Sequence, residues 1–357
     1  MTHAAITPSQ LVSADVRTAL TEYRYNFEVA LGDYQMPEDV ALGTQDTSSA
    51  LVVKYPMPVG DPVFLPLVSD QPNYRNLSEI FLSFSTGVYQ DGVKDSATRL
   101  RSSEWARRGW GKQPAMHAEA LRLLYSRLLA TALMAGESTA SPENVDGTST
   151  IKFFQTSHPC NPFGGTSTYD NLFTGGGALP LSQTSVTTVR KKFRTQKGQN
   201  GTDYRNLPLT HVLVGPDLEE TALTLFKEDM ILEASGAGAT ESRSLRPNPQ
   251  KKYAPVSVLV NPYLTETGVW YPISAGVMGA PWITLTKIPD NSGRVAGMPG
   301  PALIGADGIE WTIDDETSET YKHGSKVGPK GTVAIAAQVE AGAALTIPWR
   351  IFRCKAT

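Results

Sequence analysis

Apolar positions recur at helical spacing near the start of the chain. Val16, Leu20, Tyr23 and Phe27 follow one another at intervals of three or four residues, which places them on one face of a helix. The run Ser13-Ala-Asp-Val supplies residue types that favour a helix start. We therefore expect an amphipathic helix of about five turns, whose apolar stripe must be buried against another part of a structure.

A second helical pattern is longer. Residues 115–135 contain neither Gly nor Pro, and Leu121, Leu124 and Leu128 fall on one stripe. Pro114 precedes the pattern and Gly136 follows it, and these residue types commonly open and close a helix. The pattern predicts a helix over residues 115–135, about 30 Å long.

Between these helices the pattern indicates strands interrupted by proline. Five prolines lie between residues 56 and 72. Because proline cannot donate a hydrogen bond to a ladder, runs such as Val63-Phe-Leu predict edge strands or an extended arm. Residues 80–93 predict a further pair of strands. With few apolar positions available for a core, this region is expected to project from the body.

The second half of the chain alternates helices with strands. A basic helix is expected over residues 182–197, and a strand at 211–214 precedes a helix that runs from Asp217 through Phe226. Further strands are expected at 256–260, 269–273 and 282–286, which completes an α/β lobe. The tail from residue 311 is expected to form two strands, 333–336 and 345–352, that pair with each other. The fold class is therefore α+β.

Composition narrows the class of protein. The 357 residues are 40% hydrophobic and 19% charged, with a formal charge of −3, which excludes chain-wide disorder and a whole-protein basic field for nucleic acid. Cys160 and Cys354, the only cysteines, are too few for a disulfide framework and indicate a reducing compartment. No apolar stretch is long enough to cross a bilayer, and the first residues do not resemble a signal peptide. No membrane partner is expected.

Charge is segregated along the chain. Residues 1–47 hold seven acidic residues, opposed only by Arg17 and Arg24. Residues 94–127 hold eight basic and three acidic residues, a net charge of +5, and residues 190–205 are also basic. Either basic stretch could contact a nucleic-acid backbone, but few aromatic residues are interleaved with them. We expect them rather to pair with acidic segments of neighbouring copies, because patches of opposite sign align identical subunits.

The sequence contains no recognisable catalytic or metal-binding motif. None of the five histidines stands at the spacing of a helical zinc site, and His158 with Cys160 lacks a second pair of ligands. There is no Gly-x-Ser-x-Gly elbow and no phosphate-binding loop. The acidic run from Asp307 to Glu319 does not match a calcium loop. We expect no catalytic residues, no metal and no cofactor.

The order of parts resembles the major capsid protein of tailed phages, with its Hong Kong phage-type fold. The middle of the chain is most similar to the phage Mu major head subunit family. This similarity covers roughly residues 10–240, and the C-terminal tail departs from it. The stretches that carry it are Tyr89-Gln-Asp-Gly-Val-Lys-Asp, the helix from Pro114 to Met134, Phe153-Phe154-Gln-Thr-Ser-His158-Pro159 with Asn161, and His211-Val-Leu-Val-Gly-Pro-Asp-Leu-Glu.

The resemblance implies a domain organisation. Residues 1–47 would be an N-terminal arm and residues 48–98 an extended E-loop hairpin. Residues 99–205 would form a peripheral (P) domain with the spine helix 115–135, and residues 206–310 an axial (A) domain. Residues 311–357 would return to the P domain as strands.

The resemblance also implies a function. The chain would self-assemble as hexamers and pentamers into an icosahedral shell that encloses phage double-stranded DNA, built in the host bacterial cytoplasm and carried in the virion. Portal, scaffolding and decoration proteins would be further partners. The alternatives are an encapsulin-like compartment of the same fold and an enzyme of an unrecognised family. The residues expected at contacts between subunits are Tyr23, Phe27, Pro56, Pro62, Phe64, Arg99, Arg107, Arg108, Asp314 and Glu316.

Two physical expectations follow from a subunit with projecting arms. A compact globule of this mass would expose about 14,000 Å², and we expect the single subunit to expose clearly more. We also expect a chain lacking residues 1–45 to keep a folded body but to fail to build closed shells.

Overall fold

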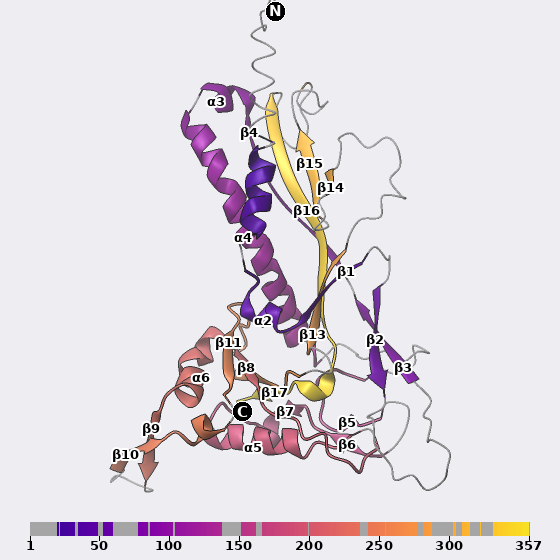
Figure 1. Ribbon diagram of the computed structural model, residues 1–357, viewed down its shortest axis with the longest axis vertical. Coiled ribbons are helices and arrows are strands. Elements are labelled where there is room, and N and C mark those ends of the chain that lie inside the picture. Colours follow the sequence, from indigo (N-terminus) through magenta and orange to yellow (C-terminus); the bar gives the residue numbers. More distant parts are fainter. Residues whose placement is uncertain are drawn as a thin grey trace, which may run out of the picture.

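The chain divides into an elongated half and a lobe (Figure 1). The computed structural model describes residues 20, 22–32, 35–48, 53–59, 78–84, 86–102, 104–137, 151–161, 166–198, 200–235, 242–253, 255–276, 281–287, 303–304, 309–314, 322 and 331–356. Every statement about structure concerns these residues.

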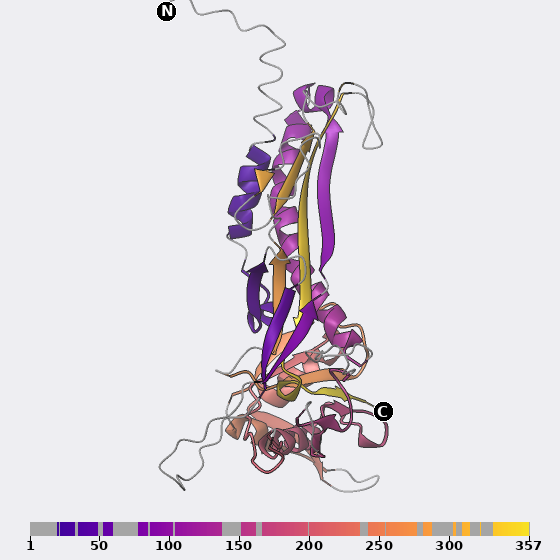
Figure 2. The same ribbon diagram turned by 90° about the vertical axis from the view of Figure 1, so that its right-hand side faces the viewer.

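The elongated half is one long helix, α4 (Glu104–Ala135), lying along a twisted sheet (Figures 1 and 2). The long strand β16 is its axis and pairs antiparallel with β4, β13 and β15, while β1 joins β13 in parallel. Its six strands are β1 (Thr44–Ser48), β4 (Gly87–Ser96), β13 (Trp282–Lys287), β14 (Leu303–Ile304), β15 (Glu310–Asp314) and β16 (Thr332–Leu345).

A helix formed by residues 22–32 covers the junction of α4 and this sheet. Its stripe of Leu20, Tyr23, Phe27 and Leu31 is buried against residues of α4, β15 and β16, among them Trp311. The short helices α2 (Glu38–Ala41) and α3 (Ala97–Ser102) lie before β1 and before α4.

The lobe contains a mixed five-stranded sheet in the order β11-β8-β12-β17-β7. The helices α5 (Gln183–Arg194) and α6 (Glu219–Phe226) supply Val186, Phe193 and Phe226 to its core. The strands are β7 (Leu172–Phe173), β8 (His211–Val214), β11 (Ser257–Val260), β12 (Val269–Ile273) and β17 (Arg353–Lys355).

Three two-stranded pieces complete the described chain. The hairpin of β2 (Val53–Val59) and β3 (Ser78–Phe84) stands beside the sheet of the elongated half. The lobe carries β5 (His158–Pro159) with β6 (Thr168–Tyr169), and β9 (Met230–Ser235) with β10 (Ser242–Pro247). Short 3-10 helices occur at Gly175–Gly177, Pro216–Leu218, Pro249–Lys252 and Pro348–Arg350.

The prediction that the long helix begins after Pro114 is wrong. The helix starts at Glu104, eleven residues before the predicted start at residue 115, and Pro114 lies inside it. An internal proline costs a helix about 3 kcal/mol of stability. Trp110 and Ala118, on either side of Pro114, are nevertheless buried in the apolar core shared by α4, the helix of residues 22–32, β15 and β16, which we call the first core. Burial of this turn against the sheet offsets the lost hydrogen bond.

Gly136 does end the long helix, but for a reason other than the expected one. The φ angle of Gly136 is not positive, so this residue does not form a left-handed cap. A Cβ at this position would lie 2.5 Å from a ring carbon of Phe154. The glycine is required because the Phe154 ring passes directly over the helix end.

Several strand partners differ from those expected. Residues 80–93 do not pair with themselves, because β3 pairs with β2 while β4 pairs with β16. The predicted pair of tail strands is also wrong: 333–336 belongs to β16 of the long sheet, whereas 345–352 is mostly not a strand and contains a 3-10 helix at Pro348–Arg350. The strand that follows it, β17, joins the lobe sheet. Local sequence specifies that a segment is extended, but not which distant strand completes its ladder.

Two boundaries between the expected domains are contradicted by packing. The helix α5, assigned to the domain of the long helix, buries its apolar face in the lobe. Strand β13, assigned to the lobe, belongs instead to the long sheet. The tail, residues 311–357, does not return as one unit to the domain of the long helix, since Phe352 and Cys354 are buried in the lobe core.

The expectation for a chain lacking residues 1–45 also needs correction. Tyr23 and Phe27 belong to the first core, and Val40 belongs to a cluster with Leu124 and Tyr125 of α4. Removing these residues would expose both clusters. The start of this chain is therefore part of the folded body from residue 20 onward.

Candidate functional site

The residues predicted to lie between subunits are scattered in the structure. Tyr23 and Phe27 are 2% and 1% exposed and pack on Trp311 of the same chain. Their contacts are therefore internal, and their burial does not support the predicted role between subunits. The stripe looked unpartnered in sequence because its partners lie more than 80 residues away.

The basic residues and the hairpin residues lie on the elongated half. The side chain of Arg99 is 69% exposed, with Asp95 at 3.7 Å. Arg107 and Arg108 belong to α4, Pro56 belongs to β2, and Asp314 ends β15. Pro62, Phe64 and Glu316 lie outside the described residues. These positions remain predicted contact residues.

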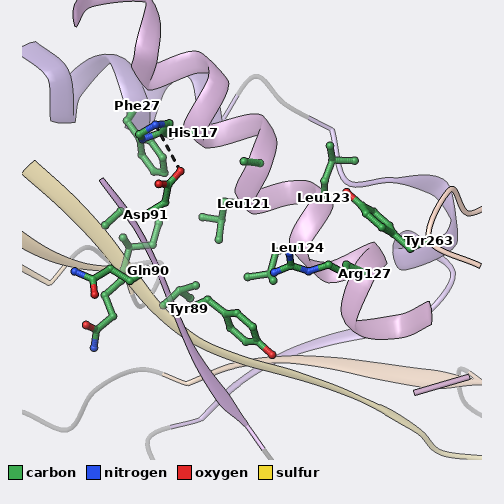
Figure 3. A pocket seen from close by; sticks show the side chains of 15 residues that line it. Phe27, Tyr89, Gln90, Asp91, His117, Leu121, Leu123, Leu124, Arg127 and Tyr263 are labelled. Atoms are coloured by element: carbon green, nitrogen blue, oxygen red, sulfur yellow. Dashed lines mark ion pairs between the residues drawn. The ribbon is translucent and has the colours of Figure 1, made fainter. Parts of the chain in front are cut away.

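A hollow of about 380 Å³ lies between α4 and the long sheet (Figure 3). Its walls are apolar side chains such as Leu121, Leu124 and Val339. Asp91 lies 3.5 Å from Nε2 of His117 at one end, and Arg127 lies over the Tyr89 ring, 5.9 Å from its centroid.

The polar end of this hollow does not form a catalytic arrangement. The hydroxyl of Tyr23 lies 2.7 Å from Nδ1 of His117. Burial, followed by the charge of Asp91, raises the pKa of Tyr23 above its ordinary value. The phenol therefore stays protonated and acts as a hydrogen-bonding group. No Ser or Cys that could act as a nucleophile is among the lining residues. The shape suits an apolar side chain or segment.

His158 and Cys160, which were considered from the sequence as a pair of metal ligands, are buried in the lobe. The His158 ring stacks on Tyr169 with centroids 4.8 Å apart, and its Nδ1 lies 3.2 Å from the Pro159 carbonyl oxygen. Burial lowers the pKa of His158 to about 4, so this imidazole is neutral at pH 7. Across the described residues, no three His, Cys, Asp or Glu side chains gather as metal ligands.

A buried carboxylate joins the elongated half to the lobe. Asp39 of α2 is 3% exposed and accepts hydrogen bonds from Ser126 Oγ of α4 at 2.9 Å and from Asn261 Nδ2 of the lobe at 2.7 Å. The indole of Trp282 donates to the Asp39 carbonyl at 3.0 Å. Burial raises the pKa of the Asp39 carboxyl, and these hydrogen bonds partly oppose that shift.

A buried arginine forms the second joint. Arg353 of β17 is 1% exposed and donates through Nη1 to the carbonyls of Leu133 and Met134 at the end of α4, at 3.0 and 2.9 Å. Its Nη2 contacts both carboxylate oxygens of Glu266 at 2.6 and 2.7 Å, and Glu137 lies 3.0 Å from Nε. A cation at the C-terminus of a helix is favoured by the helix dipole.

Sequence reasoning missed both joints. Asp39 stands in an acidic stretch and resembles a solvated residue, so no local signal marks it as buried. Arg353 interrupts the apolar run from Ile351 to Cys354, and a charge within a buried strand could have indicated a paired residue. Together the two joints hold the elongated half and the lobe in one orientation.

The exposed surface agrees with the expectation for an elongated subunit. The chain exposes 20509 Å², about 1.5 times the value for a compact globule of the same mass.

None of the described helices has the length and apolar character needed to cross a membrane.

Comparisons with known proteins give a family and a fold. A family model described as "Phage capsid protein" matches residues 106–346, and a search of curated proteins finds no match. A chain of the procapsid of bacteriophage JBD30 aligns with a TM-score of 0.52 and 11% identity, covering 99% of this chain and 77% of that one.

Two other solved structures align less well. A chain of the capsid of the native GTA particle is 11% identical, with a TM-score of 0.47 and 88% of each chain covered. A chain of an encapsulin complex from Synechococcus elongatus is 8% identical, with a TM-score of 0.41, covering 89% of this chain and 86% of that one. The similarity to the JBD30 procapsid chain, at 11% identity, concerns the fold alone.

Proposed function

Because this chain belongs to the phage capsid protein family and is a major capsid shell protein of the virion, we propose that it assembles as hexamers and pentamers into an icosahedral shell around double-stranded DNA. The expected absence of enzymatic activity forms part of this proposal, as do assembly in the host bacterial cytoplasm and contacts with portal, scaffolding and decoration proteins. A closer likeness to the phage Mu head subunit family remains a prediction.

The observation that carries the proposal is the excess of exposed surface. A single subunit that exposes 20509 Å² leaves apolar and polar area that neighbouring subunits can bury. Interfaces of obligate assemblies bury roughly 2,000–5,000 Å² each, and a shell subunit makes several of them. The surface excess is of the size that a few such interfaces would remove.

The β2–β3 hairpin is suited to serve as an arm for these contacts. It is a separate two-stranded sheet, with β2 and β3 paired only with each other among the described strands. An isolated two-stranded sheet is marginally stable in water, so coverage by another subunit would stabilise it. We propose that the hairpin overlaps a neighbour and that the lobes gather around the capsomer axes.

Electron microscopy of the purified full-length chain, with nuclease-protected nucleic acid measured in the same fractions, tests the function. We expect closed shells tens of nanometres across, and double-stranded DNA inside particles taken from phage-producing cells. Subunits that stay monomeric at high concentration would overturn the proposal. Shells that enclose a cargo protein in place of DNA would favour the encapsulin-like alternative.

A variant in which a Gly-Ser linker replaces residues 53–84 tests the hairpin. Its elongated half and lobe should fold, because β2 and β3 pair with each other and belong to neither the long sheet nor the lobe sheet. We expect folded subunits that do not close into shells. Normal shells from this variant would contradict the proposed role of the hairpin.

A further inference from the structure

The helix α5 has two faces of different chemistry. Val186, Val189 and Phe193 are fully buried in the lobe core. The four basic residues of α5 all lie in its second half, and the helix contains no acidic residue. It lies on the side of the lobe away from the elongated half (Figure 1). A stripe of cations is thus fixed on a rigid element at one end of the subunit.

Part of this stripe borders a hollow of about 310 Å³ on the lobe surface. The α5 residues that line it are spaced three or four apart, as expected for one helix face, and loops before β8 and before β11 close the other side. The lining residues are Thr187, Arg190, Lys191, Arg194, Pro208, Leu209 and Tyr253.

Arg190 is held in place by neutral groups. Its Nε donates to the Gln250 side-chain oxygen at 3.1 Å, and its guanidinium lies over the Tyr253 ring, 4.7 Å from the centroid. The amide of Gln250 is fixed in turn by Thr187 Oγ1 at 3.2 Å. The Nη2 nitrogen of Arg190 is buried and has no hydrogen-bond partner among the described residues. A preorganised guanidinium is thus left with an unused donor.

The positive charge in the hollow is not neutralised within the described chain. Arg194 donates to the neutral Asn206 at 2.7 Å, and none of the lining residues is acidic. Lys192, on another face of the helix, differs because Asp170 lies 3.6 Å from its Nζ. The hollow therefore places three cations together, and a bound anion would compensate them.

We propose that this hollow binds backbone phosphates of the DNA enclosed by the shell. The inference rests on the proposed function, since it names the surface through which the shell contacts its contents. A phosphodiester accepts hydrogen bonds on several oxygens, which suits the guanidinium, ammonium and hydroxyl donors gathered here, and arginine binds phosphate through paired donors. Contact through phosphate alone carries no sequence preference, as a shell that packages any sequence requires.

The charge balance of the chain adds to this argument. A subunit with a formal charge of −3 repels DNA as a whole, so any contact with the duplex must occur through a local cationic surface. The sequence suggested that this basic stretch pairs with acidic segments of neighbouring copies. The structure instead places Arg190, Lys191 and Arg194 around one hollow with no acidic residue in its lining, and these donors suit phosphate oxygens.

Binding of a fluorescent DNA duplex to unassembled full-length subunits tests the inference. Fluorescence anisotropy would be measured over a range of salt concentrations for the wild type and for an Arg190→Gln, Arg194→Gln double variant. We expect the double variant to bind at least about tenfold more weakly, with a salt slope smaller by about two, because each phosphate contact contributes about 0.9 to that slope.

Matched variants separate this site from general charge. Lys192→Gln removes one charge from α5 outside the hollow and should change binding less than about threefold, since it loses no hollow contact. Arg190→Lys keeps the charge but loses the paired donors and should fall between wild type and the double variant. Unchanged thermal melting would show that the variants fold.

Three results would overturn the proposal. The first is an equal loss of affinity for the duplex in Lys192→Gln and in the double variant. The second is the absence of duplex binding by the wild type. The third is binding of polyglutamate as tight as that of DNA. The last would assign the hollow to an acidic segment of another copy. Electron microscopy of the same variants keeps the two proposals distinct, because closed shells can form whether or not this hollow binds DNA.

Discussion

The elongated half and the lobe obtain their cores from different parts of the sequence. In the elongated half, Tyr23 and Phe27 pack on Trp311 and on strands from the last third of the chain. In the lobe, most of the core comes from residues 173–270, and only the end of the chain is added from a distance. The elongated half thus depends on contacts between segments nearly 300 residues apart, whereas the lobe is largely local.

This difference affects how each half responds to a substitution in its core. In the elongated half, α4 and the helix of residues 22–32 pack on one sheet, and the core residues between them hold distant segments together. The lobe core is more local in sequence and should keep its structure when the elongated half loosens. A disturbance in one half can reach the other through the two joints at Asp39 and Arg353 and through a buried cluster that both halves share, which includes Leu129, Trp282 and Tyr271.

The largest expected effect comes from replacing one buried tryptophan in each half. Trp270 of the lobe is fully buried and donates from Nε1 to the Leu179 carbonyl at 2.7 Å. Trp270→Ala should cost about 5 kcal/mol of unfolding free energy, from the cavity and the lost hydrogen bond. Trp311→Ala should cost about 3–4 kcal/mol and should free the helix of residues 22–32.

Urea unfolding measures these costs, and hydrogen exchange locates them. We expect Trp311→Ala to raise exchange in the elongated half while the lobe stays protected. A loss of protection in the lobe equal to that in the elongated half would show that the two halves unfold as one unit.

A slightly smaller effect is expected at the joint formed by Arg353. Arg353→Met leaves Glu266 and Glu137 without their shared cation and the end of α4 without its donor. Breaking a buried ion pair in this way costs about 3–5 kcal/mol, and it should loosen the lobe against the long helix.

Lys355 provides the control for this joint. Its Nζ lies 2.5 Å from Glu137, but its side chain is 25% exposed, and exposed ion pairs contribute about 1 kcal/mol or less. Urea denaturation should therefore rank Arg353→Met well below Lys355→Met in stability. Equal stability of the two variants would contradict the role of Arg353 as a joint.

The smallest expected effect is a pH dependence that arises in the lobe. The pKa of His158 is lowered to about 4 in the folded chain, while an unfolded histidine titrates near 6.5. Between these values the unfolded chain binds more protons, so stability rises with pH. The contribution is complete above about pH 6.5 and up to about 3 kcal/mol is lost as the pH falls toward 4.

His158→Gln removes this titration. Unfolding free energies measured from pH 4 to pH 7 should show a flatter profile for the variant than for the wild type. The buried Asp39 acts with the opposite sign, because a raised carboxyl pKa favours the folded chain as the pH falls toward its ordinary value of 3.8. A profile unchanged by His158→Gln would show that another group governs the acid sensitivity.

Elements with a strong local pattern could be predicted from the sequence. The buried stripe of Leu20, Tyr23 and Phe27, the helix α5 within the predicted range 182–197, and the strand at 211–214 all lie where their spacing placed them. The order of these parts also indicated the capsid fold that the family match supports. Pairing partners, the start of α4 and the domain membership of β13 could not be predicted, because they depend on distant segments.

The candidate sites divide in the same way. The basic character of residues 190–194 was visible in the sequence, since charge is a property of composition. The hollow beside Arg190 was not, because Gln250 and Tyr253 arrive from a loop about 60 residues away. Asp39 gave no local signal of burial at all.

By itself, the sequence determined which segments are helical or extended, which faces are apolar and where charge is concentrated. These follow from the period of side chains along one element and need no partner. Only the tertiary structure decided that the first helix is buried within its own subunit, that the tail divides between two sheets, and that Asp39 and Arg353 join the two halves. Those outcomes depend on close packing between segments that are distant in the sequence, so the contacts of a residue are determined by the whole fold.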